Sequence, residues 1–388
     1  MIGRRLWSNQ SKKGEELSPL LFTFDNVGGH ITVPTNVVPD LVFSFDLGEW
    51  TDVVKGTAIT VPDKTIYFKI KRGKAGGLYS DSTSSNAWII SGAVKASGNI
   101  MSLLGQSGIG LEPYAFSYMF SDCTSLTTTP ELPATVLATS CYSRMFYGCT
   151  SLTTAPELPA TTLASNCYSH MFYGCTSLTT APELPATVLA TSCYYGMFGG
   201  CPSLTTAPEL PATVLADRCY YNMFSDCTSL TTTPELPATV LADSCYYGMF
   251  GGCTSLTTAT ELPATVLATS CYSRMFYGCT SLTTAPELPA TTLASNCYSR
   301  MFYGCTSLTT APELPATTLA SNCYSRMFRN CSKINYIQCL ANENVGLLSS
   351  TNYWVQNVSA SGTFVQKTGV TWRTGASGIP SGWTIVKN

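Results

Sequence analysis

The chain has 388 residues, enough for two or three domains, and 45% of them are hydrophobic, enough to bury sizeable cores. Only 11% are charged and the formal net charge is -2, which excludes a protein whose overall field attracts nucleic acid or anionic lipid. Its polar surface must come mainly from Thr, Ser, Asn and Tyr.

The first 18 residues, MIGRRLWSNQSKKGEELS, form a basic stretch that we interpret as a flexible arm or an attachment peptide. No apolar run of the length found in signal peptides follows its Arg and Lys residues. No later window approaches the roughly 18 apolar residues of a membrane-spanning helix. We therefore expect neither a signal peptide nor a membrane span.

Residues 19–105 alternate apolar and polar side chains in short stretches such as LLFTFDN, LVFSFDLGEW and TIYFKIKRG. Turn signals, among them Pro39-Asp40 and Pro62-Asp63, separate these stretches. Alternation bounded by turns is typical of strands, so we predict a small antiparallel β-sandwich or barrel. An atypical capping repeat then leads into the next unit.

A period of 26 residues runs from Ala115 to Cys331 without an insertion or a deletion. The stretch CYSRMFYGCTSLTTAPELPATTLASN at 141–166 recurs letter for letter twice more. Strict repetition with apolar columns indicates a solenoid, in which each coil buries its apolar side against its neighbours. We expect nine such coils within residues 106–331.

Each coil contains two kinds of segment. Leu163, Cys167, Met171 and Cys175 fall four apart, which predicts a short helix or helical turns with one apolar stripe. The remaining part, CTSLTTAPELP, is too short and too rich in Thr and Pro for a helix. We predict that it is extended and stacks in parallel with its copies.

Two cysteine columns follow the same period, and we predict that they form a reduced, buried ladder of small hydrophobic side chains. If the segment between the two cysteines of a coil is helical, about 12 Å of rise separates them, beyond the reach of a disulfide. A few disulfides are the alternative; a metal site is disfavoured because the chain has no CxxC motif and only two histidines. The predicted ladder includes Cys141, Cys149, Cys167, Cys175, Cys193, Cys201, Cys219 and Cys227.

The stretch MFYGCTSLTTAPELP resembles the BspA-like leucine-rich repeat family of bacterial surface proteins, whose arrays also occur in phages of gut bacteria. The resemblance covers the repeat array and extends through GTFVQKTGVTWRTGASGIPSGWTI to tails that follow such arrays. The coils depart from the family in their length and in carrying Met119 and Met145 where Ala is usual. The resemblance implies an α/β-type leucine-rich repeat solenoid, which we expect to end in a short β-rich cap at 332–388.

Variation between coils concentrates in three short patches that flank the predicted helical arm. We expect these patches, together with the tyrosine column that begins at Tyr142, to share one outer region of the solenoid. Such Tyr-, Ser-, Asn- and Arg-rich surfaces are typical of adaptable recognition, although mere tolerance of variation is the alternative. The candidate ligand-binding residues lie in the middle coils: Tyr195, Arg218, Tyr221, Asn222 and Tyr247.

Candidates for catalysis are few. His170 lies close to Cys167, but the equivalent position holds Arg or Gly in most other coils. The glutamate column from Glu131 to Glu313 has no second carboxylate column beside it, as a glycosidase needs. We interpret it as a solvated row, with a calcium or cationic-ligand row as the alternative. We therefore expect no enzyme, no cofactor and no metal.

The family resemblance implies surface recognition or adhesion. We expect a phage virion fibre, spike or decoration protein that binds a glycan or protein of the bacterial host surface through its repeats, because no signal peptide is seen. Its N-terminal region would then contact other virion proteins. The alternative is a bacterial cell-surface adhesin, and neither setting requires nucleic acid or a membrane span.

Overall fold

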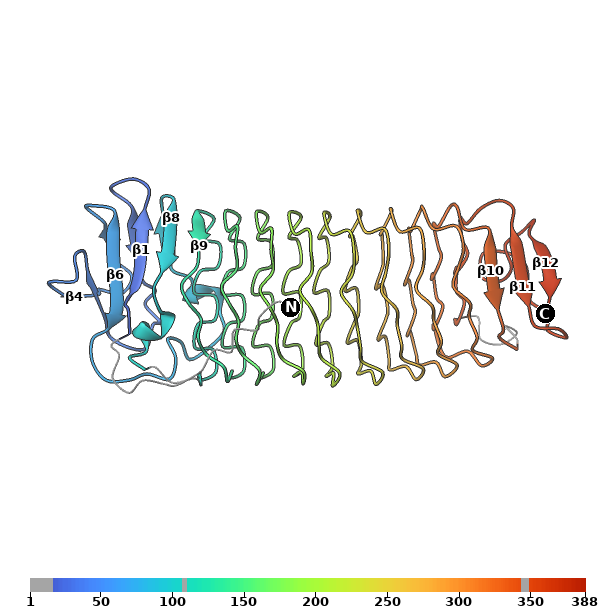
Figure 1. Ribbon diagram of the computed structural model, residues 1–388, viewed down its shortest axis with the longest axis horizontal. Helices are drawn as coiled ribbons and strands as arrows, with labels where there is room; N and C mark the ends of the chain where they lie inside the picture. Colours follow the sequence, from blue (N-terminus) through green and yellow to red (C-terminus); the bar gives the residue numbers. More distant parts are fainter. Residues whose placement is uncertain (1–16, 107–109, 343–348) are drawn as a thin grey trace, which may run out of the picture.

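The computed structural model describes residues 17–106, 110–342 and 349–388, so the predicted N-terminal arm lies almost entirely outside the described residues. Figure 1 shows a rod, with a strand-rich unit at one end, a stack of similar coils along its length and a small parallel sheet at the other end. Among the described residues, no helix has both the length and the apolar character needed to cross a bilayer.

The N-terminal unit consists of short strands and two 3-10 helices. They are β1 (Leu20–Phe24), β2 (His30–Thr32), β3 (Leu41–Ser44), β4 (Thr51–Asp52), β5 (Ala58–Thr60), β6 (Thr65–Ile70), η1 (Ser84–Asn86), β7 (Ile89–Ser91), β8 (Val94–Ser97) and η2 (Ile100–Leu103). Strand β1 shows why they form, because its alternation places Leu20, Phe22 and Phe24 in the core.

These strands form two sheets, one of order β4-β3-β6-β1-β8-β9 and one of order β5-β2-β7. Pairing is antiparallel except between β8 and β9 (Leu126–Thr128), which is parallel. Because β9 belongs to the first coil, the larger sheet crosses the boundary predicted at residue 105. The ring of Phe22 also lies 6.0 Å from that of Phe120, so one apolar core continues into the array.

The predicted helical arm is wrong in detail, because this side of each coil is a chain of turns. Amides such as that of Met145 donate to the carbonyl three residues earlier, at 3.2 Å, whereas amides such as that of Arg144 donate to the next coil, at 2.9 Å. No α-helix occurs in the described residues. Half of the amides of the arm therefore depend on a neighbouring coil for their hydrogen bonds.

A positive φ at every fourth residue produces these turns. In one coil Ser140, Arg144 and Gly148 have φ values of 54°, 55° and 69°. A left-handed residue costs about 1–2 kcal/mol unless it is glycine, so the hydrogen bonds between coils must offset this strain. Between the left-handed residues, pairs of side chains point inward. The inward pairs of this coil are Cys141 with Tyr142 and Met145 with Phe146.

The inward aromatic side chains stack into ladders along the rod. Tyr142 and its equivalents in the following coils are almost fully buried, and ring centroids such as those of Tyr168 and Tyr194 lie 5.8 Å apart with nearly parallel planes. The expectation that this tyrosine column belongs to the outer recognition surface is therefore wrong. These rings are core, since each turn sends two consecutive side chains inward.

The opposite side of each coil is extended, as predicted, but its pairing is sparse. Single parallel bridges join Thr154 to Thr180 and Thr180 to Thr206. At the far end, β10 (Tyr336–Cys339), β11 (Thr363–Gln366) and β12 (Thr384–Lys387) form a parallel sheet. The indole of Trp354 closes the core there, stacking on Tyr324 at 6.1 Å.

All 18 cysteines are free and buried. In the second column each thiol from Cys149 to Cys331 donates to a phenylalanine carbonyl of the preceding coil, as from Cys175 Sγ to Phe146 O at 3.1 Å. Burial raises the pKa of Cys175 to about 12, which keeps the sulfur protonated and able to donate. Without a helix, the distance argument against disulfides no longer holds. The thiol hydrogen bond argues against them instead, because the sulfur of a disulfide has no proton to donate.

We predict that thiol titration in denaturant without reductant recovers nearly all cysteines as free thiols. Recovery of most of them as disulfides would contradict the buried-ladder prediction. As a companion measurement, Cys219→Ser should lower the free energy of unfolding by about 1–3 kcal/mol, because it buries a more polar hydroxyl among apolar neighbours. The titration decides between the alternatives, since loss of a disulfide would destabilise by a similar amount.

Candidate functional site

Two columns of side chains on the outer side of the turn arm define the candidate site. The first outer column lies two residues after the first cysteine of each coil and the second lies six residues after it. The first holds Ser143, Ser169, Tyr195, Tyr221, Tyr247, Ser273, Ser299 and Ser325. The second holds Tyr147, Tyr173, Gly199, Ser225, Gly251, Tyr277, Tyr303 and Arg329. The serines of the first column are buried, whereas its three tyrosines are half-buried.

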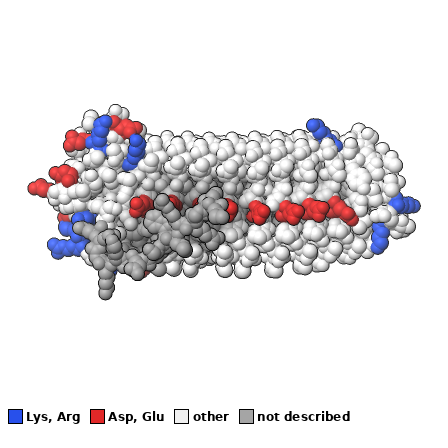
Figure 2. All heavy atoms as spheres, viewed as in Figure 1, with Lys and Arg blue, Asp and Glu red and all other residues white. Residues whose placement is uncertain are grey.

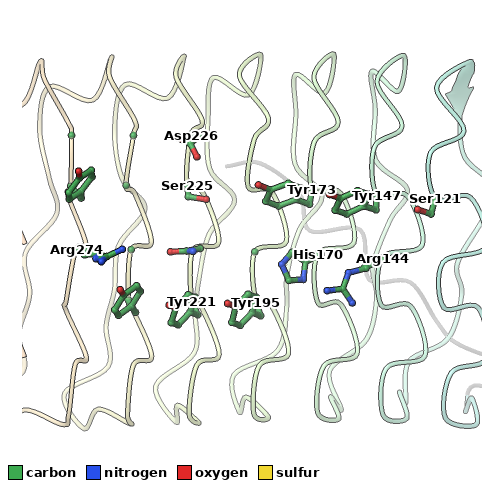
Figure 3. Close-up of a pocket in the computed structure, with 18 of the residues that line it drawn as sticks. Ser121, Arg144, Tyr147, His170, Tyr173, Tyr195, Tyr221, Ser225, Asp226 and Arg274 are labelled. Atoms are coloured by element: carbon green, nitrogen blue, oxygen red, sulfur yellow. The ribbon is translucent and has the colours of Figure 1, made fainter. Parts of the chain in front are cut away.

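In three adjacent coils the tyrosine moves from the second outer column to the first. The rings of Tyr195, Tyr221 and Tyr247 then stack on one another, with centroids 4.6 and 4.4 Å apart and planes within 7°. Small residues, Ser225 and Gly251 among them, take the vacated positions of the second column. Figure 3 shows Tyr147 and Tyr173 in one row and Tyr195 and Tyr221 in the row beside it.

The exchange opens a groove of about 830 Å³ along the rod. The stacked tyrosines of the first column form one wall, and Tyr173 and Tyr277 of the second column lie on either side of the positions that hold small residues. Ser225 and Gly251 line the space between these two rings. An elongated hollow with aromatic walls and a small-residue floor suits a linear or flat ligand that packs against rings.

The charges that line the groove are spread along it. The carboxylate of Asp226 is exposed in its middle, and the guanidinium of Arg274 lies 5.6 Å from the Tyr247 ring. Burial, with a smaller contribution from Arg144, lowers the pKa of His170 to about 4, so this imidazole is neutral at pH 7. Burial also raises the pKa of Tyr221, which keeps its hydroxyl available as a donor.

Most of the predicted ligand-binding residues meet in this groove. Tyr195, Tyr221, Asn222 and Tyr247 all line it, and each is half-buried. Arg218 is exposed and does not line the groove. The tyrosine substitutions in the first outer column identified one wall of the groove. The second outer column loses its tyrosines in the same coils, and comparing the two columns would have identified the hollow as well.

The predicted glutamate row is exposed along its whole length. Figure 2 shows acidic side chains in a line along the rod. Its members are Glu131, Glu157, Glu183, Glu209, Glu235, Glu261, Glu287 and Glu313, all exposed. Within the described ranges, no group of three or more His, Cys, Asp or Glu is placed to hold a metal ion.

Cys167 and His170, considered above as a nucleophile and its base, have pKa values that do not suit these roles. Burial raises the pKa of the Cys167 thiol to about 12, whereas a nucleophilic cysteine needs a lowered value. The Nδ1 atom of His170 lies 3.0 Å from the hydroxyl of Ser169, so this ring nitrogen is engaged elsewhere.

Comparison with known proteins agrees with the repeat architecture. The profile of the BspA type leucine-rich repeat region matches residues 115–231 and 217–346, in six copies. Neither a curated protein nor a solved structure matches the chain. The profile spans more than half of the 388 residues and covers the coils that carry the groove. The chain belongs to the BspA-type leucine-rich repeat family.

Proposed function

We propose that the chain is a non-enzymatic surface recognition protein that binds a glycan or protein of the bacterial cell surface in the tyrosine groove. BspA-type repeats suggest surface adhesion or recognition in general. The observation that carries the proposal is the exchange between the two outer columns, which exposes three stacked tyrosines beside a hollow in adjacent coils. Tyrosines at such positions supply contact area at low entropic cost.

For the biological setting we propose a phage virion fibre, spike or decoration protein, with the N-terminal region held by other virion proteins. The second candidate is a bacterial cell-surface adhesin, which the BspA-type family itself favours. Mass spectrometry of purified phage particles and of washed cell surfaces separates the two, since each setting predicts the chain in only one fraction.

Filling the groove tests the proposal. Tyrosine is the natural residue of the second outer column, so Ser225→Tyr with Gly251→Tyr would extend the stack of Tyr277 and Tyr303, whose rings are 4.8 Å apart. A Cβ atom at Gly251 would lie 3.3 Å from the Gly248 carbonyl oxygen, a tight contact that a small backbone shift would relieve. Tyr277 and Tyr303 occupy the equivalent position in the following coils, so the coil should accept the change. We expect cell binding to fall by about tenfold or more, because the added rings occupy the ligand's space.

The matched control is Val240→Tyr, which adds a ring of the same size at a 76% exposed position outside the groove. This variant should bind cells as the unaltered protein does, and circular dichroism should show both variants folded. Full binding by the folded groove-filled variant would contradict the proposal.

A further inference from the structure

A second hollow of about 290 Å³ adjoins the groove towards the C-terminal end of the array. Its lining consists of arginines and tyrosines: Arg274, Tyr277, Arg300, Tyr303, Arg326 and Arg329. Because Arg274 and Tyr277 line both hollows, the two form one continuous depression along the rod. We call the four guanidinium groups of the second hollow the arginine ladder.

The arginine ladder concentrates like charges in a chain that has few charges. Arg274, Arg300 and Arg326 occupy the same position in three successive coils, which are spaced about 4.8 Å apart in a parallel stack. All are half-buried. The ion pairs between described residues use Lys55 and Lys71, so no described carboxylate neutralises the ladder.

Three of these guanidinium groups also have an unsatisfied donor. The Nε atoms of Arg274, Arg326 and Arg329 are buried without an acceptor among the described residues. A buried donor without an acceptor is destabilising, and more so when it is charged. Burial, and then the neighbouring Arg274 and Arg326, lower the pKa of Arg300, so the cations repel one another. The anionic oxygens of a ligand would accept hydrogen bonds from the unpaired Nε donors and reduce the repulsion between the cations. The planar guanidinium group matches the geometry of sulfate, phosphate and carboxylate groups.

We propose that the arginine ladder binds the anionic groups of a linear acidic glycan whose sugar rings lie in the adjoining tyrosine groove. This inference rests on the proposed function and narrows its ligand class. The tyrosines of the groove stack on one another at 4.4 and 4.6 Å, so no nucleic-acid base can insert between them and the ligand must lie along the outside of the stack. The exposed glutamate row and the net charge of -2 also oppose a long polyanion that wraps the rod.

The test uses the full chain and four polymers: neutral dextran, dextran sulfate, polygalacturonate and inorganic polyphosphate. We expect at least one acidic polymer to bind and neutral dextran not to bind, with affinity that falls as NaCl is raised. Comparing sulfate, carboxylate and phosphate polymers identifies the anion. Equal affinity for dextran and dextran sulfate, or no binding to any acidic polymer, would overturn the inference.

A second test uses variants of the arginine ladder. Asparagine occupies the same coil position at Asn222 with φ 51°, so Arg274→Asn, Arg300→Asn and Arg326→Asn together should leave the backbone unchanged. We expect this triple variant to lose affinity for the acidic polymer by about tenfold or more, because it removes three guanidinium groups that can donate charged hydrogen bonds to the polymer. Unchanged affinity would overturn the inference.

Arg218→Ser is the control, because it removes an exposed charge outside both hollows and Ser192 and Ser244 occupy that position naturally. It should bind as the unaltered protein does; an equal loss would show an unspecific charge effect and overturn the inference. So would a single-stranded oligonucleotide that binds more tightly than every acidic glycan. Cell binding that survives in the asparagine variant would overturn the ladder alone and leave the proposed function standing.

Discussion

Tyr194→Ala should lower the free energy of unfolding by about 3–5 kcal/mol, the usual cost of removing a large buried aromatic ring. The Tyr194 ring is 1% exposed and stacks on Tyr168 at 5.8 Å and on Tyr220 at 5.7 Å. A coil in a solenoid is stabilised only by its two neighbours, and this substitution weakens both interfaces at once. Guanidinium unfolding followed by circular dichroism measures the change.

Tyr194→Phe separates the ring from its hydroxyl. The buried hydroxyl of Tyr194 has no hydrogen-bond partner among the residues that the structure describes, and an unsatisfied buried polar group costs about 1–3 kcal/mol. We therefore expect the phenylalanine variant to be as stable as the unaltered protein or about 1 kcal/mol more stable. If Tyr194→Phe were as unstable as Tyr194→Ala, the hydroxyl would have to make a stabilising contact. That result would contradict the prediction that stacking of the aromatic rings stabilises the coil.

The architecture of the array could be predicted from sequence because repetition reveals which columns are apolar. Leucines such as Leu152 and Leu178 and the two cysteine columns recur every 26 residues, and all are buried. Columns of this kind require only that copies lie on top of one another. The internal conformation of a coil was harder to predict, since it depends on contacts with neighbours that the sequence of one coil does not contain.

The helical prediction failed because a turn every four residues and a helix both place apolar side chains four apart. Cys167, Met171 and Cys175 are spaced correctly for either. The evidence for turns lay in the residues between them: Asn166 and Gly174 are types that tolerate a positive φ, and both adopt one, at 57° and 73°. Turns also account for the buried tyrosine column, because the two residues that follow a left-handed position, such as Cys167 and Tyr168, both point inward.

The groove was partly predictable. Departure from the consensus marked Tyr195, Tyr221 and Tyr247, whereas the hollow beside them depends on what the second outer column loses in the same coils. The arginine ladder could not be identified in this way, because its residues do not depart from the consensus. Arg274, Arg300 and Arg326 are consensus residues, and only their stacking in successive coils, without carboxylates, makes them unusual.

Changing Tyr195, Tyr221 and Tyr247 together to Ser should abolish binding to cells while leaving the fold intact. Truncating a true anchor typically costs about 2 kcal/mol or more, so losing a wall of three stacked rings should reduce affinity by a hundredfold or more, at about tenfold per 1.4 kcal/mol. The coils should accept serine because it is the natural residue of the first outer column, where the hydroxyls of Ser273 and Ser299 donate to carbonyls of the next coil.

The matched control changes Val188, Val214 and Val240 to Thr, the residue that other coils carry at that position, on an exposed column outside the groove. This control touches coils of the same region and should bind fully. If the folded tyrosine variant also bound fully, recognition would have to lie in residues 19–105 or in the C-terminal cap at 332–388. The repeat array would then act as a spacer, and the stacking of Tyr195, Tyr221 and Tyr247 would serve only to stabilise the contacts between coils.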